Sequence, residues 1–342
     1  MEREPKAVVS ASESEDSTGS TDKAQVLSII GPVFNEEEVL PRLFRRLDSV
    51  LEDLTCEVEV ILVDNRSTDA TRQLARQKVA QDHRYRYIRF SRNFGPSVEA
   101  SITAAYRACV GDAALVLYSD LQDPPELIPQ FVDLWREGYD VVYGVQRSRG
   151  GEPLWRRTGA RIFYRLLARM SEIPIPVDTG DFRLVSRSVI TVLLAMPERA
   201  RYSRGLIAWI GFEQTAIRYD REPRSGGQSK ANASAIIRTA FNGLTAFSHT
   251  PLRYLTGVGL ILSSVCTVLI CSNLALWLFA EPIPGMTTVV ILILFGIGAN
   301  VLALGLLGEY IARLQTDVKK RPLYIVAETD NLPGFPLGPD DL

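Results

Sequence analysis

The sequence predicts an α/β fold with a mostly parallel sheet, joined to a membrane-spanning region. Two observations lead to this prediction. Short β-rich runs alternate with amphipathic helical stretches over the first 230 residues, a pattern typical of a parallel sheet covered by helices on both faces. Two long runs without any charged residue then occupy the C-terminal third, and each is long enough to cross a bilayer.

The overall charge of the 342-residue chain narrows the class of partner. Its formal net charge is −2, whereas domains that bind nucleic acid are usually strongly basic, so nucleic acid is not expected as a partner. Residues 1–24 are rich in Ser, Glu, Asp and Thr and poor in large apolar side chains. Such a segment cannot bury enough surface to offset its ordering entropy, so we expect a disordered leader that is not a secretory signal.

The alternation of strands and helices begins at residue 25. In the first helix, Asn35 is the expected N-cap, and three glutamates follow in the first turn, where the helix dipole favours anions. We expect one domain over residues 25–230. Its strands are expected at 25–33, 58–64, 86–90, 114–119 and 140–144, and its helices at 35–54, 68–80 and 97–108, with one more before the last strand.

Polar clusters follow each of the first four expected strands, in residues 32–37, 64–69, 91–95 and 120–126. The carboxyl ends of parallel strands meet at one edge of a sheet, and ligands of such folds bind in the crevice beyond that edge. We therefore expect the four clusters to form one site.

The fourth cluster carries oxygen donors suited to a divalent cation. Asp120, Gln122 and Asp123 lie on the loop after the strand, where they could hold Mg²⁺ or Mn²⁺ and neutralise charge on a diphosphate. An acidic turn that ends at Pro124 and Pro125 accounts for the same residues. The chain has two histidines, and its four cysteines show no metal-binding spacing, so a zinc or haem site is not expected.

The second cluster has two interpretations that spacing does not separate. Asp64 can accept a hydrogen bond from a base or a ribose, while Ser67 and Thr68 can cap the following helix. Capping alone accounts for the Ser and the Thr.

The C-terminal third predicts a transmembrane hairpin over residues 251–312. Its spans are expected at about 255–279 and 288–312, joined by a short connector. Basic residues flank both spans, so the positive-inside rule puts both termini and the N-terminal domain in the cytoplasm, with 313–342 as a cytoplasmic tail. A buried helix pair in a soluble protein is the alternative.

Two further segments have amphipathic character. Residues 231–250 combine low charge with a modest apolar stripe, which suits an interfacial helix lying along the bilayer surface. Residues 153–170 are both basic and apolar. They fit a helix on the acceptor side, an oligomer contact or a plain amphipathic surface helix.

Six strings of residues occur in an order that resembles a known family. They are PVFNEEE (32–38), VDNRSTD (63–69), SRNFG (91–95), SDLQDPPE (119–126), DTGDFRL (178–184) and RGLIAWIGF (204–212). Together they resemble the membrane-anchored family 2 glycosyltransferases that move a sugar from a nucleotide donor to a polyprenyl phosphate, such as bactoprenol glucosyltransferases and dolichol-phosphate mannose synthases. The resemblance runs from about residue 25 to 325 and implies a GT-A-type, Rossmann-like sheet for the N-terminal domain.

The resemblance also implies roles for particular residues. Asp64 resembles the acid that contacts the base or ribose, and Asp120 the principal metal contact, with Gln122 and Asp123 beside it. Asp181 resembles the proposed catalytic carboxylate near the acceptor. The implied nucleotide-sugar site comprises Pro32, Asn35, Glu36, Asp64, Asn93 and Asp120, and the implied phosphate or acceptor site comprises Arg204, Arg221, Arg224 and Lys230.

Two positions depart from the family's pattern. The usual Asp-Asp-Gly-Ser reads Asp64-Asn65-Arg66-Ser67 here, which replaces one carboxylate by an amide. The first acid of the family's Asp-x-Asp is Tyr118, so the metal site has one negative charge fewer. Either Asp123 compensates or the metal binds more weakly.

The reaction implied by the resemblance is inverting transfer from a nucleotide-sugar, such as UDP-glucose, to undecaprenyl phosphate or a similar lipid. The lipid phosphate is already largely dianionic at neutral pH. Asp181 is therefore expected to position the acceptor or the sugar at least as much as to take a proton. The main rate effect is expected from stabilisation of the departing diphosphate. The basic loop at 221–230 is either a mobile clamp for a phosphate or a solvated loop.

The resemblance further implies an inner (cytoplasmic) membrane location and a homo-oligomer, a tetramer in relatives. Two other functions stay open. A processive polysaccharide synthase shares the catalytic fold but needs more than the two spans counted here. A catalytically inactive, membrane-tethered nucleotide-sugar-binding protein is suggested by Tyr118 and Asn65.

Overall fold

The computed structural model describes residues 25–95, 98–146, 179–198, 201–222 and 285–336, and a few helical positions between 261 and 272. Several predicted features lie outside these residues and stay predictions. They are the leader at 1–24, the amphipathic segments at 153–170 and 231–250, most of the first predicted span, and the side chains of Arg224 and Lys230.

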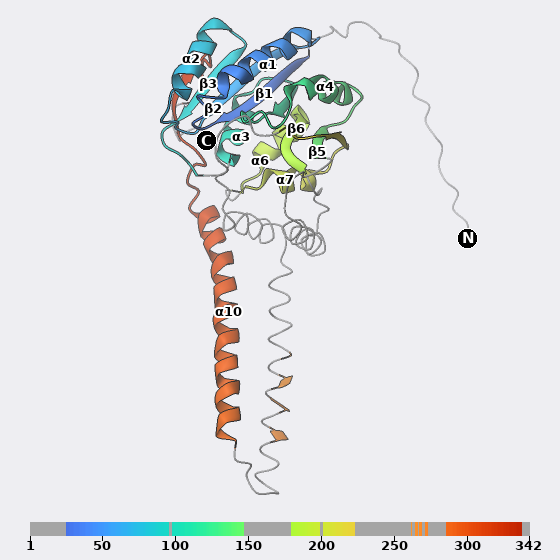
Figure 1. The fold of residues 1–342 in the computed structure, drawn as a ribbon. Helices are drawn as coiled ribbons and strands as arrows, with labels where there is room; N and C mark the ends of the chain where they lie inside the picture. Colours follow the sequence, from blue (N-terminus) through green and yellow to red (C-terminus); the bar gives the residue numbers. More distant parts are fainter. Residues whose placement is uncertain are drawn as a thin grey trace, which may run out of the picture.

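An eight-stranded sheet forms the centre of the α/β domain (Figure 1). The strand order is β7-β5-β6-β4-β1-β2-β3-β8. β6 and β8 run antiparallel to their neighbours, and the other pairings are parallel. The strands are β1 (Val26–Val33), β2 (Glu57–Asp64), β3 (Tyr85–Phe90), β4 (Ala113–Val116), β5 (Val141–Gln146), β6 (Thr179–Ser186), β7 (Gln214–Tyr219) and β8 (Val326–Asp330).

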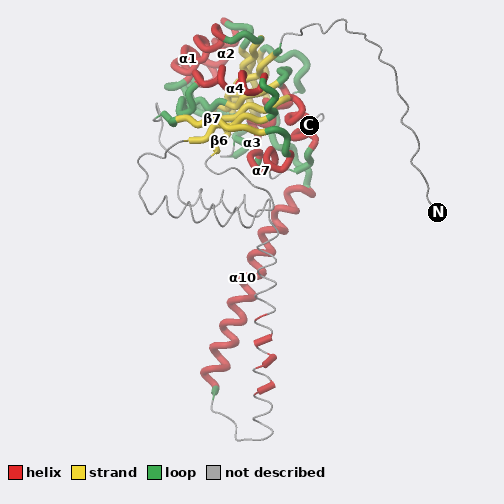
Figure 2. Tube along the Cα trace, turned by 90° about the vertical axis from the view of Figure 1, so that its right-hand side faces the viewer, coloured by secondary structure: helices red, strands yellow, loops and turns green. Residues whose placement is uncertain are grey.

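Helices cover both faces of this sheet, and Figure 2 shows α1 and α2 above the strands and α7 below them. Side chains of α1, α2 and α4 pack with Leu27 and Ile29 on one face, and those of α3, α6 and α7 pack with Ile30 on the other. Successive strand side chains point to opposite faces, so the apolar runs fill two cores at once. The predicted α/β, mostly parallel architecture is confirmed. The helices are α1 (Leu40–Asp53), α2 (Thr71–Gln81), α3 (Glu99–Ala108), α4 (Ile128–Arg136, after the short 3₁₀ turn η1, Pro125–Leu127), α6 (Arg187–Ala195) and α7 (Ser203–Ile210).

The first predicted helix begins later than expected. α1 starts at Leu40, and Asn35 has a left-handed backbone with a φ of 54°. The prediction of Asn35 as the N-cap is therefore wrong. Residues 36–39 form a turn in which the carbonyl of Glu36 accepts a hydrogen bond from the N–H of Leu40. The segment between β1 and α1 is thus a loop at the edge of the sheet.

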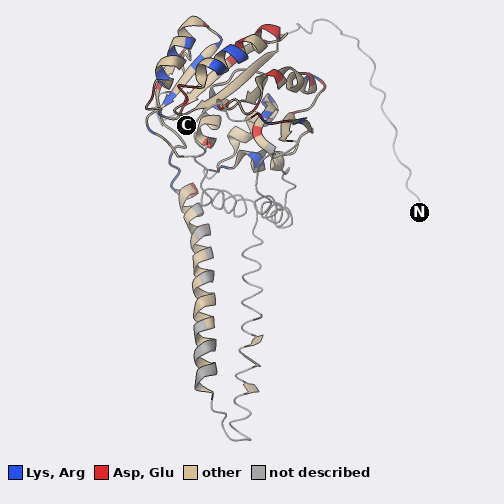
Figure 3. Cartoon of the chain, in the orientation of Figure 1, with Lys and Arg blue, Asp and Glu red and all other residues tan. Residues whose placement is uncertain are grey.

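α10 (Met286–Val318) extends away from the α/β domain as a long helix (Figure 1). Among the described residues, it holds the one stretch long and apolar enough to cross a membrane, Phe295–Val318, and none of that stretch is buried. Phe295, Val301 and Leu304 are each at least 60% exposed. Figure 3 marks the charged residues along the ribbon of the α/β domain and at the end of α10 nearest to it. The second predicted span is therefore confirmed as an apolar helix, while the two-span hairpin stays a proposal.

The chain returns to the sheet after α10. β8 pairs with the outer edge of β3, with Glu328 opposite Arg89. Just before this strand, Tyr324 is 1% exposed and stacks on Phe90 with ring centroids 5.2 Å apart. The edge of β3 is thus covered by a strand that follows the apolar helix in the sequence.

Candidate active site

The polar clusters meet at one edge of the sheet, as the sequence predicts. Val33 lies opposite Asp64 in the β1–β2 pair, and Asp64 lies opposite Arg89 in the β2–β3 pair. β4 runs parallel to β1 and ends at the same edge. β6 runs the other way, so its first residues reach this edge, and Arg183 lies opposite Val116 at the end of β4. Asp181, two residues before Arg183, therefore joins the clusters from the opposite strand direction.

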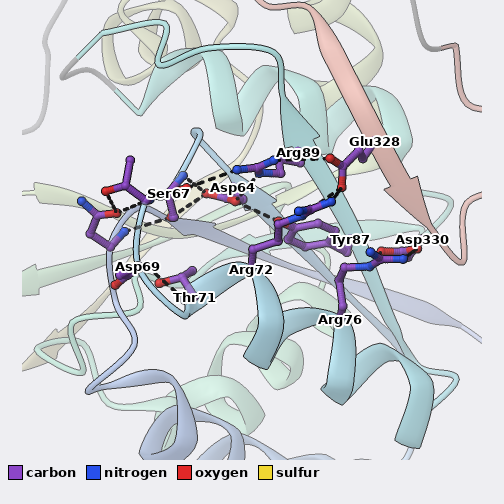
Figure 4. A network of polar contacts seen from close by, with 12 residues as sticks. Asp64, Ser67, Asp69, Thr71, Arg72, Arg76, Tyr87, Arg89, Glu328 and Asp330 are labelled. Carbon is purple, nitrogen blue, oxygen red and sulfur yellow. Dashed lines mark hydrogen bonds and ion pairs between the residues drawn. The ribbon is translucent and has the colours of Figure 1, made fainter.

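Asp64 is fully buried and surrounded by donors (Figure 4). Its Oδ1 accepts from the N–H and the hydroxyl of Ser67 at 2.7 and 2.6 Å. Its Oδ2 accepts from the hydroxyl of Tyr87 at 2.8 Å and from Nε of Arg89 at 3.3 Å. Burial and the charge of Asp64 raise the pKa of Tyr87, which keeps its hydroxyl protonated as a donor. A carboxylate has about four acceptor sites, and these donors fill them. The geometry favours a role for Asp64 beneath a ligand site over direct contact with the ligand.

The loops after β1 and β2 are tied together by reciprocal hydrogen bonds. The N–H of Asn35 donates to Oγ of Ser67 at 3.0 Å, and Oδ1 of Asn35 accepts from the N–H of Thr68 at 2.8 Å. The N–H of Glu36 donates to Oγ1 of Thr71 at 2.8 Å. α2 begins at Thr71 without a side-chain cap. The interpretation of Ser67 and Thr68 as helix caps is therefore wrong, because these residues hold the neighbouring loop.

Asn65 holds the third cluster in place. Its Nδ2 donates to Oδ1 of Asn93 at 3.2 Å and to the carbonyl of Gly95 at 3.1 Å, and its Oδ1 accepts from the N–H of Phe94 at 3.0 Å. An ionised carboxylate could accept from Phe94 but could not donate to the other two oxygens. The amide at this position, which departs from the family's pattern, thus matches the loop that it contacts.

The loop of the fourth cluster turns at Leu121, whose φ of 56° is rare for a bulky residue. The side chain of Leu121 is fully buried, whereas Asp120 and Gln122 on either side of it are half-buried. Oδ1 of Asp120 accepts from the N–H of Gln122 at 3.2 Å. Burial of Leu121 therefore keeps Asp120 and Gln122 at the surface of the edge.

Asp123 differs from its neighbours because it is only 2% exposed. Its Oδ1 accepts from the hydroxyl of Tyr219 and lies 3.6 Å from Nε of Arg221. Burial raises the pKa of Asp123, although Tyr219 and Arg221 act in the opposite direction. In this arrangement Asp123 anchors the segment that follows β7, and Arg221 lies beside it.

Arg46 of α1 fastens the fourth cluster to the same segment. Its guanidinium donates to both carboxylate oxygens of Glu126, at 2.8 and 2.6 Å, and to both of Glu222, at 3.0 and 2.8 Å. The N–H of Glu222 donates to the carbonyl of Gln122 at 3.0 Å. We call Arg46, Glu126 and Glu222 the arginine latch.

Asp181 is paired with Arg204. Nε and Nη2 of Arg204 donate to the two carboxylate oxygens at 2.7 and 2.8 Å, and the hydroxyl of Tyr118 donates to Oδ2. Burial by itself raises the pKa of Asp181, but the hydrogen bonds and charge of Arg204 outweigh burial and leave the pKa well below its ordinary value. The structure therefore favours an ionised Asp181 paired with Arg204.

The donor set fits a divalent cation that is bound partly by its substrate. Within the described ranges, no three His, Cys, Asp or Glu side chains gather into a metal-binding group. One oxygen of Asp123 is engaged by Tyr219, whereas Asp120 and Gln122 stay at the surface of the edge. Mg²⁺ is commonly held by one or two carboxylates together with substrate phosphates. Asp120 and Gln122 fit that kind of site.

Most of the predicted site residues meet at this edge. Pro32 lies in β1 and contributes its carbonyl, which accepts from the hydroxyl of Ser119 at 3.4 Å. The described members that the edge collects are Pro32, Asn35, Glu36, Asp64, Asn93, Asp120, Gln122, Asp123, Asp181, Arg204 and Arg221. Sequence reasoning missed Tyr87, Arg89 and Glu328. Tyr87 and Arg89 stand two residues apart in a strand and so share one face, which was the available signal for both.

Comparison with known proteins shows similarity to one family, two relatives and one solved structure. Residues 28–194 match the family described as "Glycosyl transferase family 2". An uncharacterized glycosyltransferase of Synechocystis sp. is 40% identical over 315 residues, covering 91% of this chain and 98% of that protein. A prophage-derived bactoprenol glucosyl transferase of Shigella flexneri is 34% identical over 307 residues, covering 89% of this chain and 98% of that protein. The structure of glucosyl-3-phosphoglycerate synthase from Mycobacterium tuberculosis aligns with a TM-score of 0.43 at 20% identity, over 65% of this chain and 79% of that one.

Proposed function

The chain belongs to glycosyl transferase family 2, and we propose that this glycosyltransferase moves a sugar from a nucleotide-sugar to a membrane polyprenyl phosphate. The observation that carries the proposal is the 34% identity to a protein named bactoprenol glucosyl transferase over 98% of that protein's length. The match covers 89% of this chain and so extends well beyond residues 28–194. The product would be a polyprenyl-phosphate-sugar.

The nucleotide of the donor is proposed to lie over the ends of β1 and β2. The loop that contains Asn35 and Glu36 and the loop after Asp64 are locked to each other there, which gives a pre-organised surface at low entropic cost. Asn93, which is exposed at the same edge, would border the sugar or the nucleotide. UDP-glucose or a similar donor is the proposed substrate.

The leaving diphosphate is proposed to lie beside Asp120 and Gln122. These two residues would hold Mg²⁺ or Mn²⁺, and a divalent cation bound there would neutralise charge on the diphosphate. Arg221, beside Asp123, lies on the same side and adds positive charge. Arg224 and Lys230 follow it in the sequence and are proposed to contact the same phosphates. Stabilisation of the departing group would supply the largest part of the rate.

The acceptor phosphate is proposed to approach Arg204. Asp181 fixes this guanidinium by a two-point contact, so that it can meet a phosphate in a defined orientation. The acceptor is largely dianionic at neutral pH and would attack the anomeric carbon in line, with inversion. Asp181 would then act by holding Arg204 and the sugar more than by taking a proton.

Because the proposed acceptor is a membrane lipid, the active site must lie close to the membrane surface. The exposed apolar side chains of α10 support its role as a membrane span. We propose that it pairs with a first span at about 255–279, that residues 231–250 lie along the bilayer surface, and that the α/β domain and both termini are cytoplasmic. A homo-oligomer, by resemblance a tetramer, is part of the same proposal.

One assay tests the proposed function. The purified full chain is given radiolabelled UDP- or GDP-sugars and a short polyprenyl phosphate, with Mn²⁺ or with EDTA. We expect label in the organic phase, and we expect Asp120→Asn to lower the rate by at least about 100-fold. Asp112→Asn is the matched control, because Asp112 lies at the opposite end of β4 and its amide form can still accept from the N–H of Val26. Label in an aqueous polymer, or no transfer with any donor, would contradict the proposal.

A further inference from the structure

The C-terminal strand β8 carries a carboxylate that reaches toward the candidate site. Oε2 of Glu328 accepts from Nη2 and Nε of Arg72 on α2 at 2.7 and 3.1 Å. Its Oε1 accepts from Nη1 of Arg89 on β3 at 3.3 Å. Figure 4 shows Glu328 on β8 facing both arginines across the sheet edge. One side chain thus ties three elements together.

Arg89 connects Glu328 to the loop after β2. Arg89 is 9% exposed, and its three guanidinium nitrogens are directed to three different acceptors. Nη1 donates to Glu328, Nε to Oδ2 of Asp64, and Nη2 to the carbonyl of Ser67 at 3.2 Å. Ser67 in turn accepts from the N–H of Asn35. A continuous chain of contacts therefore runs from β8 to both loops of the proposed donor site.

The charges of the four contacting side chains, Arg72, Arg89, Asp64 and Glu328, balance only when Glu328 is present. Arg72 and Arg89 carry two positive charges, and Asp64 and Glu328 carry two negative charges. Without the charge of Glu328, Nη1 of Arg89 would lose its charged acceptor, and Asp64 has no acceptor site left for it. Arg72 and Arg89 would also face each other with no carboxylate between them, and like charges repel, so Arg89 would be held less firmly beneath the loop.

We propose that Glu328 is a positioning residue for donor binding, which holds Arg89 so that Asp64 and the loop at 65–69 keep the shape that the nucleotide requires. This inference rests on the proposed function, in which the donor binds over that loop. Since β8 follows α10 in the chain, the donor site is completed by a strand that lies beyond the apolar helix.

The same strand offers a matched control. Asp330, two residues further on, pairs with Arg76 on α2, with Oδ2 2.8 Å from Nε. This second ion pair also joins β8 to α2, but its two residues make no contact with Arg89 or Asp64 in the interactions drawn in Figure 4. Glu328→Gln and Asp330→Asn therefore each remove one charge from β8, and only the first reaches the donor loop.

The test compares the two variants in the full-length protein. We expect Glu328→Gln to raise the KM for the nucleotide-sugar by roughly 5- to 20-fold, with kcat within about threefold. This is less than the full value of a charged hydrogen bond, because Glu328 is 32% exposed and water partly replaces the contact. Asp330→Asn should change the KM by less than about twofold. Glu328→Asp should restore part of the loss, because it returns the charge. An unchanged KM in Glu328→Gln, or equal effects of both variants, would overturn the proposal.

A second readout separates this inference from the proposed function. The N–H of Ser67 donates to Asp64, so hydrogen–deuterium exchange of a peptide covering 64–70 reports on the loop without any substrate. We expect faster exchange there in Glu328→Gln and wild-type exchange in Asp330→Asn. If the wild-type chain transferred no sugar, the proposed function would fall, and this exchange measurement would still decide whether Glu328 holds the loop. Unchanged exchange in Glu328→Gln would refute the positioning role.

Discussion

The contacts of Asp181 give a reason for the tyrosine at position 118. The hydroxyl of Tyr118 donates to the carboxylate that Arg204 also holds. An acid at position 118 would bring a second negative charge against Asp181, and two carboxylates sharing a site repel each other unless a cation lies between them. The tyrosine therefore lets Asp181 stay ionised without a metal ion at that place.

Replacement of Asp181 by Asn tests this arrangement. Arg204 would lose its charged partner, so we expect a decrease of about 2 kcal/mol in the free energy of unfolding and a lower transfer rate. The pKa of Asp181 in the folded chain lies below its unfolded value of roughly 3.9. Its stabilisation is therefore fully present above about pH 5 and is lost as the pH falls through the folded pKa.

Urea unfolding of the wild type and of Asp181→Asn at several pH values provides the measurement. The gap between the two free energies should stay constant from about pH 5 to pH 9 and narrow only in more acidic solution. A gap that changes between pH 6 and pH 8 would show that Asp181 is not ionised as described.

Sequence reasoning identified the acids of the site but not the side chains that orient them. Asp64 and Asp120 stand out because each lies at or just after the end of a predicted strand, and Asp181 stands out because the string that contains it resembles the family's. Glu328 lies 239 positions away from Arg89, and no spacing rule connects them. The N-cap predicted at Asn35 failed for the same reason, because its side chain is bound by a loop on another strand.

At the scale of elements, the arginine latch holds the loop of the fourth cluster to the segment after β7. Arg46 on α1 contributes one positive charge against Glu126 and Glu222, whose side chains are 52% and 37% exposed. Exposed ion pairs contribute little to stability, typically less than about 1 kcal/mol each. The latch therefore matters more for the relative position of its two segments than for the stability of the fold.

Arg46→Ala should separate the effect of the arginine latch on the position of the two segments from its effect on stability. We expect the free energy of unfolding to fall by about 1 kcal/mol or less, while the Mn²⁺ concentration needed for half-maximal transfer rises several-fold. Arg45→Ala is the control. Arg45 is the neighbour of Arg46 on α1, and its Nε donates to the carbonyl of Pro41 within the same helix. Equal metal dependence in the two variants would argue against the latch.

The apolar strands were predicted correctly, whereas β6 and β8, which are rich in polar residues, were not predicted. β1 and β2 are rich in apolar residues, and polar residues follow or close each of them, so both bounds could be predicted to within a residue or two. β6 contains Asp181 and Arg183, and β8 reads VAETD. Such polar strands lack the periodicity on which the prediction depends. They are stable because neighbouring strands supply their hydrogen bonds.

For the whole molecule, the outward-facing apolar surface of α10 sets it apart from the other described helices, whose apolar side chains pack on the sheet. Contiguous apolar patches of that kind mark contact with a membrane or with another protein. Insertion of a charge at the centre of a span costs roughly 2.5–3.5 kcal/mol on the insertion scale.

Leu304→Arg tests the membrane contact of α10. Leu304 is 64% exposed and lies in the candidate span. We expect a larger share of the protein to leave the membrane fraction in a carbonate wash than for the wild type. Gln315→Arg lies three residues from the end of this span, on the side nearest to the α/β domain. It should remain with the membranes like the wild type, because a long basic side chain near the end of a span can reach the interface. If both variants stayed in the pellet equally, α10 would not be the anchor.

The position of β8 also sets an order of events during biosynthesis. A ribosome makes α10 before it makes Val326–Asp330, and domains fold as their residues emerge. Until that last strand is released, β3 keeps a bare edge, of the kind to which stray strands attach. Assembly of the sheet is therefore completed only after the apolar helix has left the exit tunnel, so the newly made chain completes the proposed donor site after the proposed membrane anchor.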